Sequence, residues 1–193
     1  VKDYIAASIN VRVTYDIENG KLKVSTEQSW PISASPIKSD YGTLAGDFVY
    51  KRGGVDIFIF GKAIAPGNVP TQKMLVTVFI KGKINHSVLV YGNRFWESGF
   101  LGLSMSTPEP FLEMPLTLEN AFGGYAEWDG LQIPCPTNPF GKGFIWKKET
   151  ANGKALPNIE NPNKLISSWK DKPSPTGFVP TSFCEDRIMK ATN

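Results

Sequence analysis

The sequence contains little of the chemistry on which catalytic and metal-binding centres depend. Its 193 residues include one histidine, His86, and two cysteines, Cys135 and Cys184. A Ser-His-Asp or Cys-His centre would have to use His86, and a zinc site normally recruits more His and Cys ligands than this chain offers. Two cysteines do not make a disulfide framework. We therefore expect two free thiols in a reducing compartment, with one long-range bridge as the alternative.

The sequence also lacks a strong excess of charge and a long apolar run. It has 21 Lys and Arg against 18 Asp and Glu, which gives a net charge of +3. The basic residues are scattered, so they predict no surface for nucleic acid or for an anionic membrane. No apolar stretch reaches the length of about 18 residues that a membrane-spanning helix needs. The length suits a single domain, residues 1–193, with a core that needs no cross-links.

A period-two pattern fills the first half of the chain. Residues 8–15 alternate apolar and polar side chains, and Asn19-Gly20 is typical of a type I′ hairpin turn. We expect a hairpin there, with Leu22 and Val24 facing inward. The stretch 47–66 predicts two strands joined around Gly53-Gly54.

Two further strands are expected around a turn at residues 81–83. Residues 55–60 are apolar on both faces apart from Asp56, which predicts a central strand. The strand before the turn should place one set of side chains on a common face: Met74, Val76, Val78 and Ile80. Because no segment of useful length in this half of the chain has helical periodicity, we expect an all-β fold, mainly an antiparallel sandwich or a partly open barrel.

Glycine and proline dominate the second half, where the regular pattern weakens. We expect a strand-rich sheet in residues 1–96 and a long, irregular, loop-rich packing region in residues 97–193. Residues 129–185 predict an ordered coil, and 163–171 allow a helix of two turns at most. The expected anchors of this coil are large apolar side chains at intervals: Trp146, Leu156, Ile159 and Trp169.

No motif in the sequence predicts a defined reaction. Gly141-Lys142-Gly143 is followed by apolar residues 144–146 and lacks the spacing of a phosphate-binding loop, so we interpret it as a glycine turn. A lone strand histidine is more often packed or at the surface than catalytic. The chain also carries carboxylates that nothing brings to a defined separation: Glu109, Glu113, Glu119, Asp129 and Glu160. A hydrolase using His86 or two of these carboxylates stays a minor hypothesis.

Five tryptophans give a second alternative. Exposed indoles could stack on sugars or hold a protein partner, whereas buried ones would be core and loop anchors. We expect burial for each of them: Trp30, Trp96, Trp128, Trp146 and Trp169. Together with the Asn-rich loops, they leave a carbohydrate-binding β-sandwich as an alternative function.

Six phrases, taken in order, resemble one protein family, the domain of unknown function 2169 found in type VI secretion gene clusters. They are "DFVYKRGGVDIFIFGKAIAP" (47–66), "VYGNRFW" (90–96), "PEPFLEMPLTLENAFGG" (108–124), "NPFGKGF" (138–144), "LPNIENP" (156–162) and "SSWKDKPSPTGFVP" (167–180). The resemblance covers nearly the whole chain. It differs from the family pattern at Glu119-Asn120, where Glu-Arg is usual, and at Val179, where the family usually has glycine.

The resemblance implies a cytoplasmic bacterial adaptor or chaperone. Such a protein binds a type VI secretion effector and helps to load it onto the VgrG/PAAR spike, without a catalytic residue, a metal or another cofactor. It also implies that this chain is a shortened form of the family domain. The same resemblance implies family-motif or partner-binding residues in the loops: Phe122, Gly123, Gly124, Asn138, Pro139, Gly141, Gly143, Phe144, Leu156, Pro157, Asn158, Ile159, Glu160 and Trp169. We expect these loops to brace the sheet, and a docking surface formed by them is the alternative.

Overall fold

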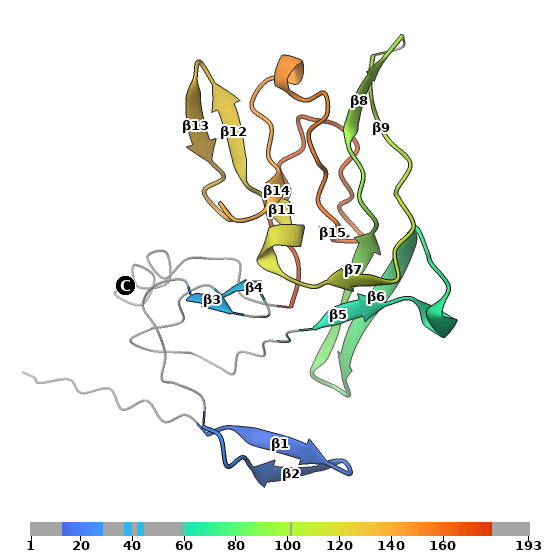
Figure 1. The fold of residues 1–193 in the computed structure, drawn as a ribbon, viewed down its shortest axis with the longest axis vertical. Coiled ribbons are helices and arrows are strands. Elements are labelled where there is room, and N and C mark those ends of the chain that lie inside the picture. Colours follow the sequence, from blue (N-terminus) through green and yellow to red (C-terminus); the bar gives the residue numbers. More distant parts are fainter. Residues whose placement is uncertain are drawn as a thin grey trace, which may run out of the picture.

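The computed structural model describes residues 13–28, 37–39, 42–44, 59, 61–100 and 102–178. Regular structure in these ranges consists of β-strands and short 3₁₀ helices (Figure 1). No helix in the described part of the chain is long and apolar enough to cross a membrane. The prediction of an all-β fold is confirmed.

The strands are short, apart from β6 and β7. The first group is β1 (Tyr15–Glu18), β2 (Lys21–Val24), β3 (Ile37–Ser39), β4 (Gly42–Leu44), β5 (Lys62–Ile64), β6 (Lys73–Ile80), β7 (Ile84–Tyr91) and β8 (Trp96–Gly99). The second group is β9 (Gly102–Met105), β10 (Glu113–Pro115), β11 (Phe122–Gly123), β12 (Tyr125–Trp128), β13 (Leu131–Pro134), β14 (Lys142–Gly143) and β15 (Ile159–Glu160). The 3₁₀ helices are η1 (Pro66–Asn68), η2 (Leu118–Asn120) and η3 (Lys148–Thr150).

These strands are grouped in several small sheets. The central sheet has the order β15-β7-β6 and is antiparallel throughout. Five antiparallel pairs accompany it: β1–β2, β3–β4, β5–β10, β8–β9 and β12–β13. The pair β11–β14 is parallel, and the β12–β13 hairpin lies between its two strands in the sequence.

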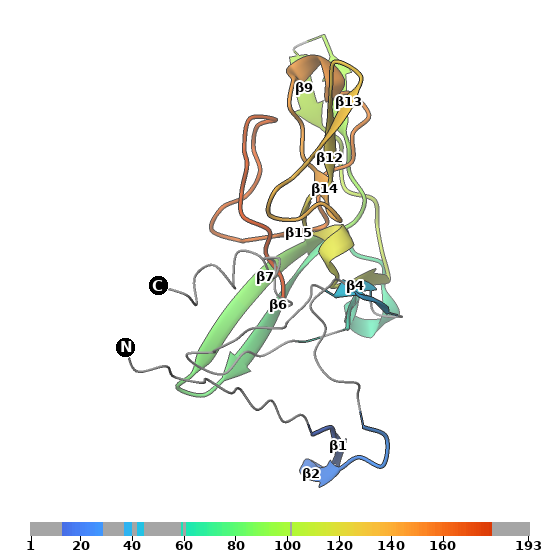
Figure 2. The ribbon, with the colours of Figure 1, turned by 90° about the vertical axis from the view of Figure 1, so that its left-hand side faces the viewer.

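The hairpin β6–β7 forms around the expected turn at residues 81–83. It extends well beyond the packed region in Figure 2. Met74, Val76 and Val78 are half-buried on one face, as the alternation predicted, whereas Ile80 at the end of the hairpin is exposed. Gly82 in the turn has φ 69°, a left-handed conformation that glycine adopts without strain.

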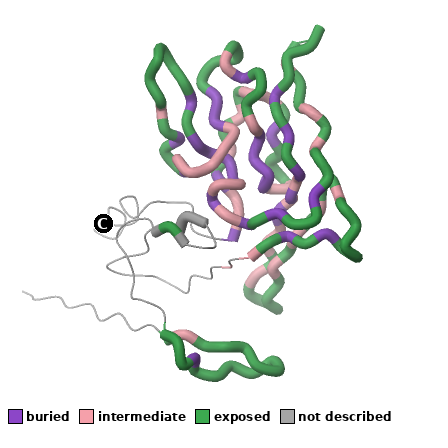
Figure 3. Tube along the Cα trace, viewed as in Figure 1, coloured by how far each residue is buried: buried purple, intermediate pink, exposed green. Residues whose placement is uncertain are grey.

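The first hairpin confirms one prediction and corrects another. Asn19 and Gly20 have φ angles of 52° and 75°, as a type I′ turn between β1 and β2 requires. Leu22 and Val24 do not face inward, because they are 70% and 57% exposed. Alternation shows which side chains share a face, but it does not show whether another layer covers that face; here the face is exposed (Figure 3).

Several expectations fall on residues outside the described ranges. They include the strand at 55–60, apart from Ile59, the turn at Gly53-Gly54, Trp30 and Cys184. Ile59 is half-buried, and its N–H donates to the carbonyl of Phe178 at 3.0 Å. Of the stretch 47–66, β5 and the start of η1 are the described regular structure.

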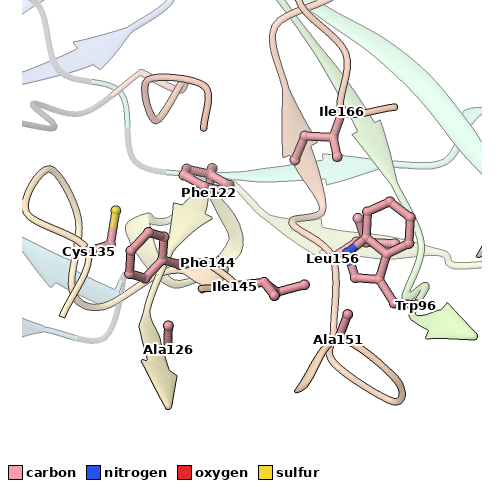
Figure 4. Close-up of a cluster of buried hydrophobic side chains, with 9 residues drawn as sticks. All are labelled: Trp96, Phe122, Ala126, Cys135, Phe144, Ile145, Ala151, Leu156 and Ile166. Atoms are coloured by element: carbon pink, nitrogen blue, oxygen red, sulfur yellow. The ribbon is translucent and has the colours of Figure 1, made fainter. Parts of the chain in front are cut away.

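Two apolar clusters form the core of the described structure. The first lies in the second half of the chain (Figure 4) and consists of Trp96, Phe122, Ala126, Cys135, Phe144, Ile145, Ala151, Leu156 and Ile166. The second covers the inner face of β6 and β7 and consists of Ala63, Val88, Val90, Phe111, Met114, Leu116, Ile159 and Phe178. Cys135 is a free, buried thiol within the first cluster.

The second half contains more regular pairing than the sequence predicted. The hairpins β8–β9 and β12–β13 lie in the region expected to be loops. Asp129 and Gly130 join β12 to β13 with φ angles of 51° and 76°, the conformation of a type I′ turn. "WDGL" is a recognisable signal for such a turn, so this hairpin was predictable.

The short helix that the sequence allowed at residues 163–171 does not form. The segment consists of bends and turns. The side chain of Asp171 accepts hydrogen bonds from the N–H groups of Ser167 and Ser168, both at 2.8 Å. Short polar side chains that bond nearby backbone groups compete with helix formation, and here they hold the chain in a turn.

The anchors of the coil are partly as predicted. Leu156 and Ile159 are buried, and Trp169 is half-buried against the first cluster. Trp146 is 48% exposed, so its predicted role as a buried anchor is wrong.

Candidate functional site

The loop signatures meet at one place in the fold. The backbone N–H of Lys142 donates to the carbonyl of Ala121 at 3.0 Å, and the N–H of Phe144 donates to the carbonyl of Gly123 at 2.9 Å. These bonds make β14 the parallel neighbour of β11. The phrases at 108–124 and 138–144 therefore form a single unit.

Asn138 holds this unit together from inside. Its side chain is fully buried, and Nδ2 donates to the carbonyls of Leu118 at 2.8 Å and Phe122 at 3.1 Å. Its own carbonyl accepts the N–H of Gly124 at 2.8 Å. Buried backbone groups need partners, so one asparagine supplies what regular strand pairing does not.

Close backbone approach explains two of the predicted glycines. A Cβ atom on Gly123 would lie 2.0 Å from the carbonyl oxygen of Asn138, and one on Gly143 would lie 2.7 Å from Cδ of Pro157. Both residues also have positive φ angles, of 151° and 97°. The two positions thus require glycine for space and for conformation.

The phrase at 156–162 joins the unit to the central sheet. The N–H of Asn158 donates to the carbonyl of Asn120, and its side chain donates to the carbonyl of Tyr91 at 3.0 Å. Ile159 pairs with Val90 on β7 and forms an isolated bridge with Ala121. All three loop signatures are therefore tied to the end of β7.

A buried ion pair completes this arrangement. The guanidinium of Arg94 donates to the carboxylate of Glu160 and to the carbonyl of Pro157, and it lies 3.7 Å from the centroid of the Tyr91 ring. The second oxygen of Glu160 accepts the N–H of Ile166 at 3.0 Å. Both side chains are buried, and the sequence did not predict the pair.

Burial governs the protonation of these groups. It raises the pKa of Glu160, against the opposing effects of Arg94 and of the Ile166 N–H. Burial also raises the pKa of Tyr91. Because the carboxylate of Glu160 is enclosed by groups of its own chain, it serves to hold the loops together.

We call this arrangement the signature framework. It consists of Phe122, Gly123, Gly124, Asn138, Pro139, Gly141, Gly143, Phe144, Leu156, Pro157, Asn158, Ile159 and Glu160. Most of these residues are buried, and Pro139, Gly141 and Gly143 are half-buried. Trp169, the remaining predicted site residue, packs half-buried against the first cluster. The geometry favours bracing, and direct contact of these residues with a partner stays a prediction.

Exposed aromatic side chains lie next to the framework. The indoles of Trp128 and Trp146 have centroids 6.3 Å apart at an angle of 34°, and the two side chains are 45% and 48% exposed. Leu131 lies opposite Trp128 in the β12–β13 pair, and Nζ of Lys147 lies 6.0 Å from the Trp128 ring. We call these four residues the aromatic ledge.

Phe144, a residue of the signature framework, contacts the aromatic ledge. The buried ring of Phe144 contacts Trp146 edge-on, with centroids 6.3 Å apart. Trp96 is buried as predicted, but the predicted burial of Trp128 and Trp146 is wrong. Trp128 is the last residue of β12, so it extends past the core that covers Ala126 on the same face.

The candidate catalytic side chains do not converge. His86 is half-buried on β7, its Nε2 lies 3.2 Å from the carbonyl of Gly177, and the ring of Phe178 meets it edge-on. Glu113 forms a surface ion pair with Lys62 at 2.8 Å, and Glu160 is held by Arg94. Within the described ranges, no group of three or more His, Cys, Asp or Glu residues is placed to hold a metal ion.

A polar hollow of about 470 Å³ lies beside the last described loops. It is lined by Asn161, Lys164, Leu165, Ser167, Asp171, Lys172, Pro173 and Ser174. Lys172 donates to the carbonyls of Ile145 and Trp169, and burial lowers its pKa. Asp171 is likewise bonded to its own loop, so Lys172 and Asp171 both serve the local fold.

These observations define an all-β protein in which three loop signatures are hydrogen-bonded into one framework. Residues 5–190 match the family described as an uncharacterized protein conserved in bacteria (DUF2169), and the chain belongs to this family. The resemblance found in the sequence is therefore confirmed at the level of the family. No curated protein and no solved structure matches the chain.

Proposed function

We propose that this protein is a cytoplasmic adaptor that binds a type VI secretion effector and helps to load it onto the VgrG/PAAR spike. Its membership of the family and the six ordered phrases support this proposal. The adaptor would hold the effector before secretion and release it when the spike docks. It would need a stable scaffold and a surface able to recognise another polypeptide.

The observation that carries the proposal is the aromatic ledge on the signature framework. Tryptophans are enriched at the centres of protein interfaces, where they contribute more binding energy than most other side chains. Trp128 and Trp146 are exposed, yet Trp146 is held by the buried ring of Phe144. A surface that is already ordered loses little conformational entropy when a partner binds.

Co-expression tests the proposal. The full-length protein should co-purify with the effector and the spike protein encoded beside it. Replacing both tryptophans of the ledge, Trp128→Ala with Trp146→Ala, should weaken capture of the effector by about tenfold or more. Tyr125→Ala is the matched control, since Tyr125 is an exposed aromatic residue on the opposite face of the same hairpin. Failure to capture either partner would count against the adaptor.

The same ledge supports carbohydrate binding as a second candidate. Two neighbouring indoles, half exposed and inclined at 34°, present flat apolar surfaces on which sugar rings can stack. A glycan array and a titration followed by tryptophan fluorescence separate the two functions. An adaptor gives no saturable response to sugars, whereas a carbohydrate-binding module gives one that the double Trp→Ala variant loses.

A further inference from the structure

β6 is the outer strand of the central sheet. Along its outer edge, every second residue directs its backbone N–H and C=O away from β7. Tyr91 lies opposite Lys73 in the β6–β7 pair, yet both backbone groups of Tyr91 bond to Asn158 on the other side of β7. The N–H of the next residue, Gly92, donates to the carbonyl of Gln72 on the other strand of the hairpin. Residues whose backbone groups point into the hairpin therefore alternate with residues whose backbone groups point out of it. In an antiparallel pair every second residue points outward. The outward residues are therefore Lys73, Leu75, Thr77 and Phe79.

Among the described residues, this edge is paired at its beginning and unpaired beyond it. Thr71 exchanges two backbone hydrogen bonds with Phe111, of 3.0 and 2.9 Å. The hydroxyl of Thr71 also donates a hydrogen bond to the carbonyl of Lys73. From Leu75 to Phe79, no strand in the described part of the chain pairs with this edge. Soluble proteins normally cover or shorten such edges, because they accept strands from other chains.

The side chains along the open edge suit an extended apolar segment. Leu75 and Phe79 are 56% and 67% exposed on the outer face, on either side of Thr77. Their spacing of four residues matches alternate positions of a strand laid beside them. Thr77 is hydrogen-bonded to Ser87 across the hairpin, which leaves a small polar side chain between the two apolar ones.

Positive charge lies at both ends of this edge. Lys73 begins β6, and Lys81 and Lys83 lie in the turn that follows it, on either side of Gly82. All three are exposed, and among the residues that the structure describes no carboxylate lies within salt-bridge distance of them. A segment that carries acidic residues at its ends would therefore complement the charge of this edge.

We propose that the outer edge of β6 binds an extended segment of the effector as an added strand. The segment has apolar side chains at alternate positions, which contact Leu75 and Phe79, and acidic residues that meet Lys73, Lys81 and Lys83. Strand addition of this kind gains affinity from backbone hydrogen bonds and specificity from alternate side chains. This inference rests on the proposed adaptor function and names where and what the adaptor would bind.

Hydrogen exchange on the full-length free protein tests whether the edge is open. The amide hydrogens of Leu75, Thr77 and Phe79 should exchange much faster than those of Val76 and Val78, which point toward β7. Equal protection of all five amides would show that the protein already covers its own edge, and it would overturn the proposal. A dimer in solution that Thr77→Pro dissociates would assign the edge to a second copy and would also overturn it.

A matched pair of variants tests the strand addition itself. Thr77→Pro removes an outward N–H, and Thr77→Ala removes the same bond to Ser87 but keeps the N–H. With equal thermal stability, Thr77→Pro should weaken capture of the co-expressed effector by about tenfold or more relative to Thr77→Ala. Equal capture by the two variants overturns the edge proposal, while the adaptor function stands.

A defined peptide decides the question without the effector. The probe is a synthetic peptide of alternating valine and threonine, as long as β6, with aspartate at both ends; its control carries lysine at both ends. The aspartate peptide should bind the wild type at least about tenfold more tightly than the lysine peptide, and Thr77→Pro should abolish the binding. If the wild type binds neither peptide, or both equally, the proposed edge site is wrong. If it captures no effector but binds the aspartate peptide, the adaptor function fails and the edge site stands.

Discussion

Asn158 and Tyr91 are joined by two hydrogen bonds that connect a loop to the end of a strand. The N–H of Tyr91 donates to the carbonyl of Asn158 at 2.7 Å, and Nδ2 of Asn158 donates to the carbonyl of Tyr91 at 3.0 Å. The second bond spans 67 residues of sequence. A single asparagine thus extends the pairing of the central sheet by one residue before β15 begins.

We predict that Asn158→Ala lowers the free energy of unfolding by about 1–3 kcal/mol, because it leaves the part-buried carbonyl of Tyr91 without its partner. Urea unfolding followed by circular dichroism measures the change. Asn163→Ala, an exposed position in the turn that follows β15, should change the stability by less than about 0.5 kcal/mol. Equal effects of the two variants would contradict the bracing role of Asn158.

Gly123 gives a test of the close contact with Asn138. We predict that Gly123→Ala lowers the free energy of unfolding by about 3 kcal/mol, from the clash with the Asn138 carbonyl and from the strained backbone. Gly153→Ala is the control: it has a positive φ of 75° but no atom within 4 Å of the added Cβ. Its cost should be about 1 kcal/mol, from backbone strain alone. Thermal melts of both variants rank the two effects, and the reverse order would refute the steric explanation.

Local sequence patterns predicted the class of fold and the hairpins they directly encode. The turn at Asn19-Gly20 and the hairpin β6–β7 follow from alternation and from residues that tolerate positive φ. The same reasoning would have found β12–β13 from Asp129-Gly130. These features depend on a few adjacent residues, so a local pattern is sufficient to predict them.

Contacts between distant segments were not predictable in this way. Arg94 and Glu160 are 66 residues apart, and nothing in either phrase indicates that they pair. The exposure of Leu22, Val24, Trp128 and Trp146 was also missed, because apolar character predicts burial only where another element covers the residue. The candidate surfaces for a partner are therefore the part of the molecule that the sequence predicted least.

The pair Arg94–Glu160 should contribute to stability in a strongly coupled way. We predict that Arg94→Leu or Glu160→Leu alone costs about 3–5 kcal/mol, because each leaves a buried charge without its partner. The double variant should cost much less than the sum. Lys62→Ala, which breaks the exposed pair with Glu113, should cost about 1 kcal/mol or less. A double-mutant cycle from urea unfolding gives the coupling, and strict additivity would show that the buried charges do not depend on each other.

Asp171 should make the loop at 167–171 sensitive to acid. The N–H groups of Ser167 and Ser168 hold the pKa of this carboxyl below its ordinary value of 3.8. Between the two values the unfolded chain binds a proton that the folded chain does not, so the contribution of Asp171 is complete above about pH 4 and is lost as the pH falls through the lower pKa.

Asp171→Asn keeps the shape of the side chain and removes its titration. We predict that it is less stable than the wild type at pH 7 and that the difference shrinks steadily below pH 4, as the wild-type carboxyl takes up its proton. Urea unfolding at a series of pH values measures this difference. Asn163→Ala, an exposed substitution that involves no titrating group, is the control, and its difference from the wild type should stay the same across these pH values. A difference between Asp171→Asn and the wild type that stays constant down to pH 2 would mean that the hydrogen bonds from Ser167 and Ser168 do not favour the ionised carboxylate.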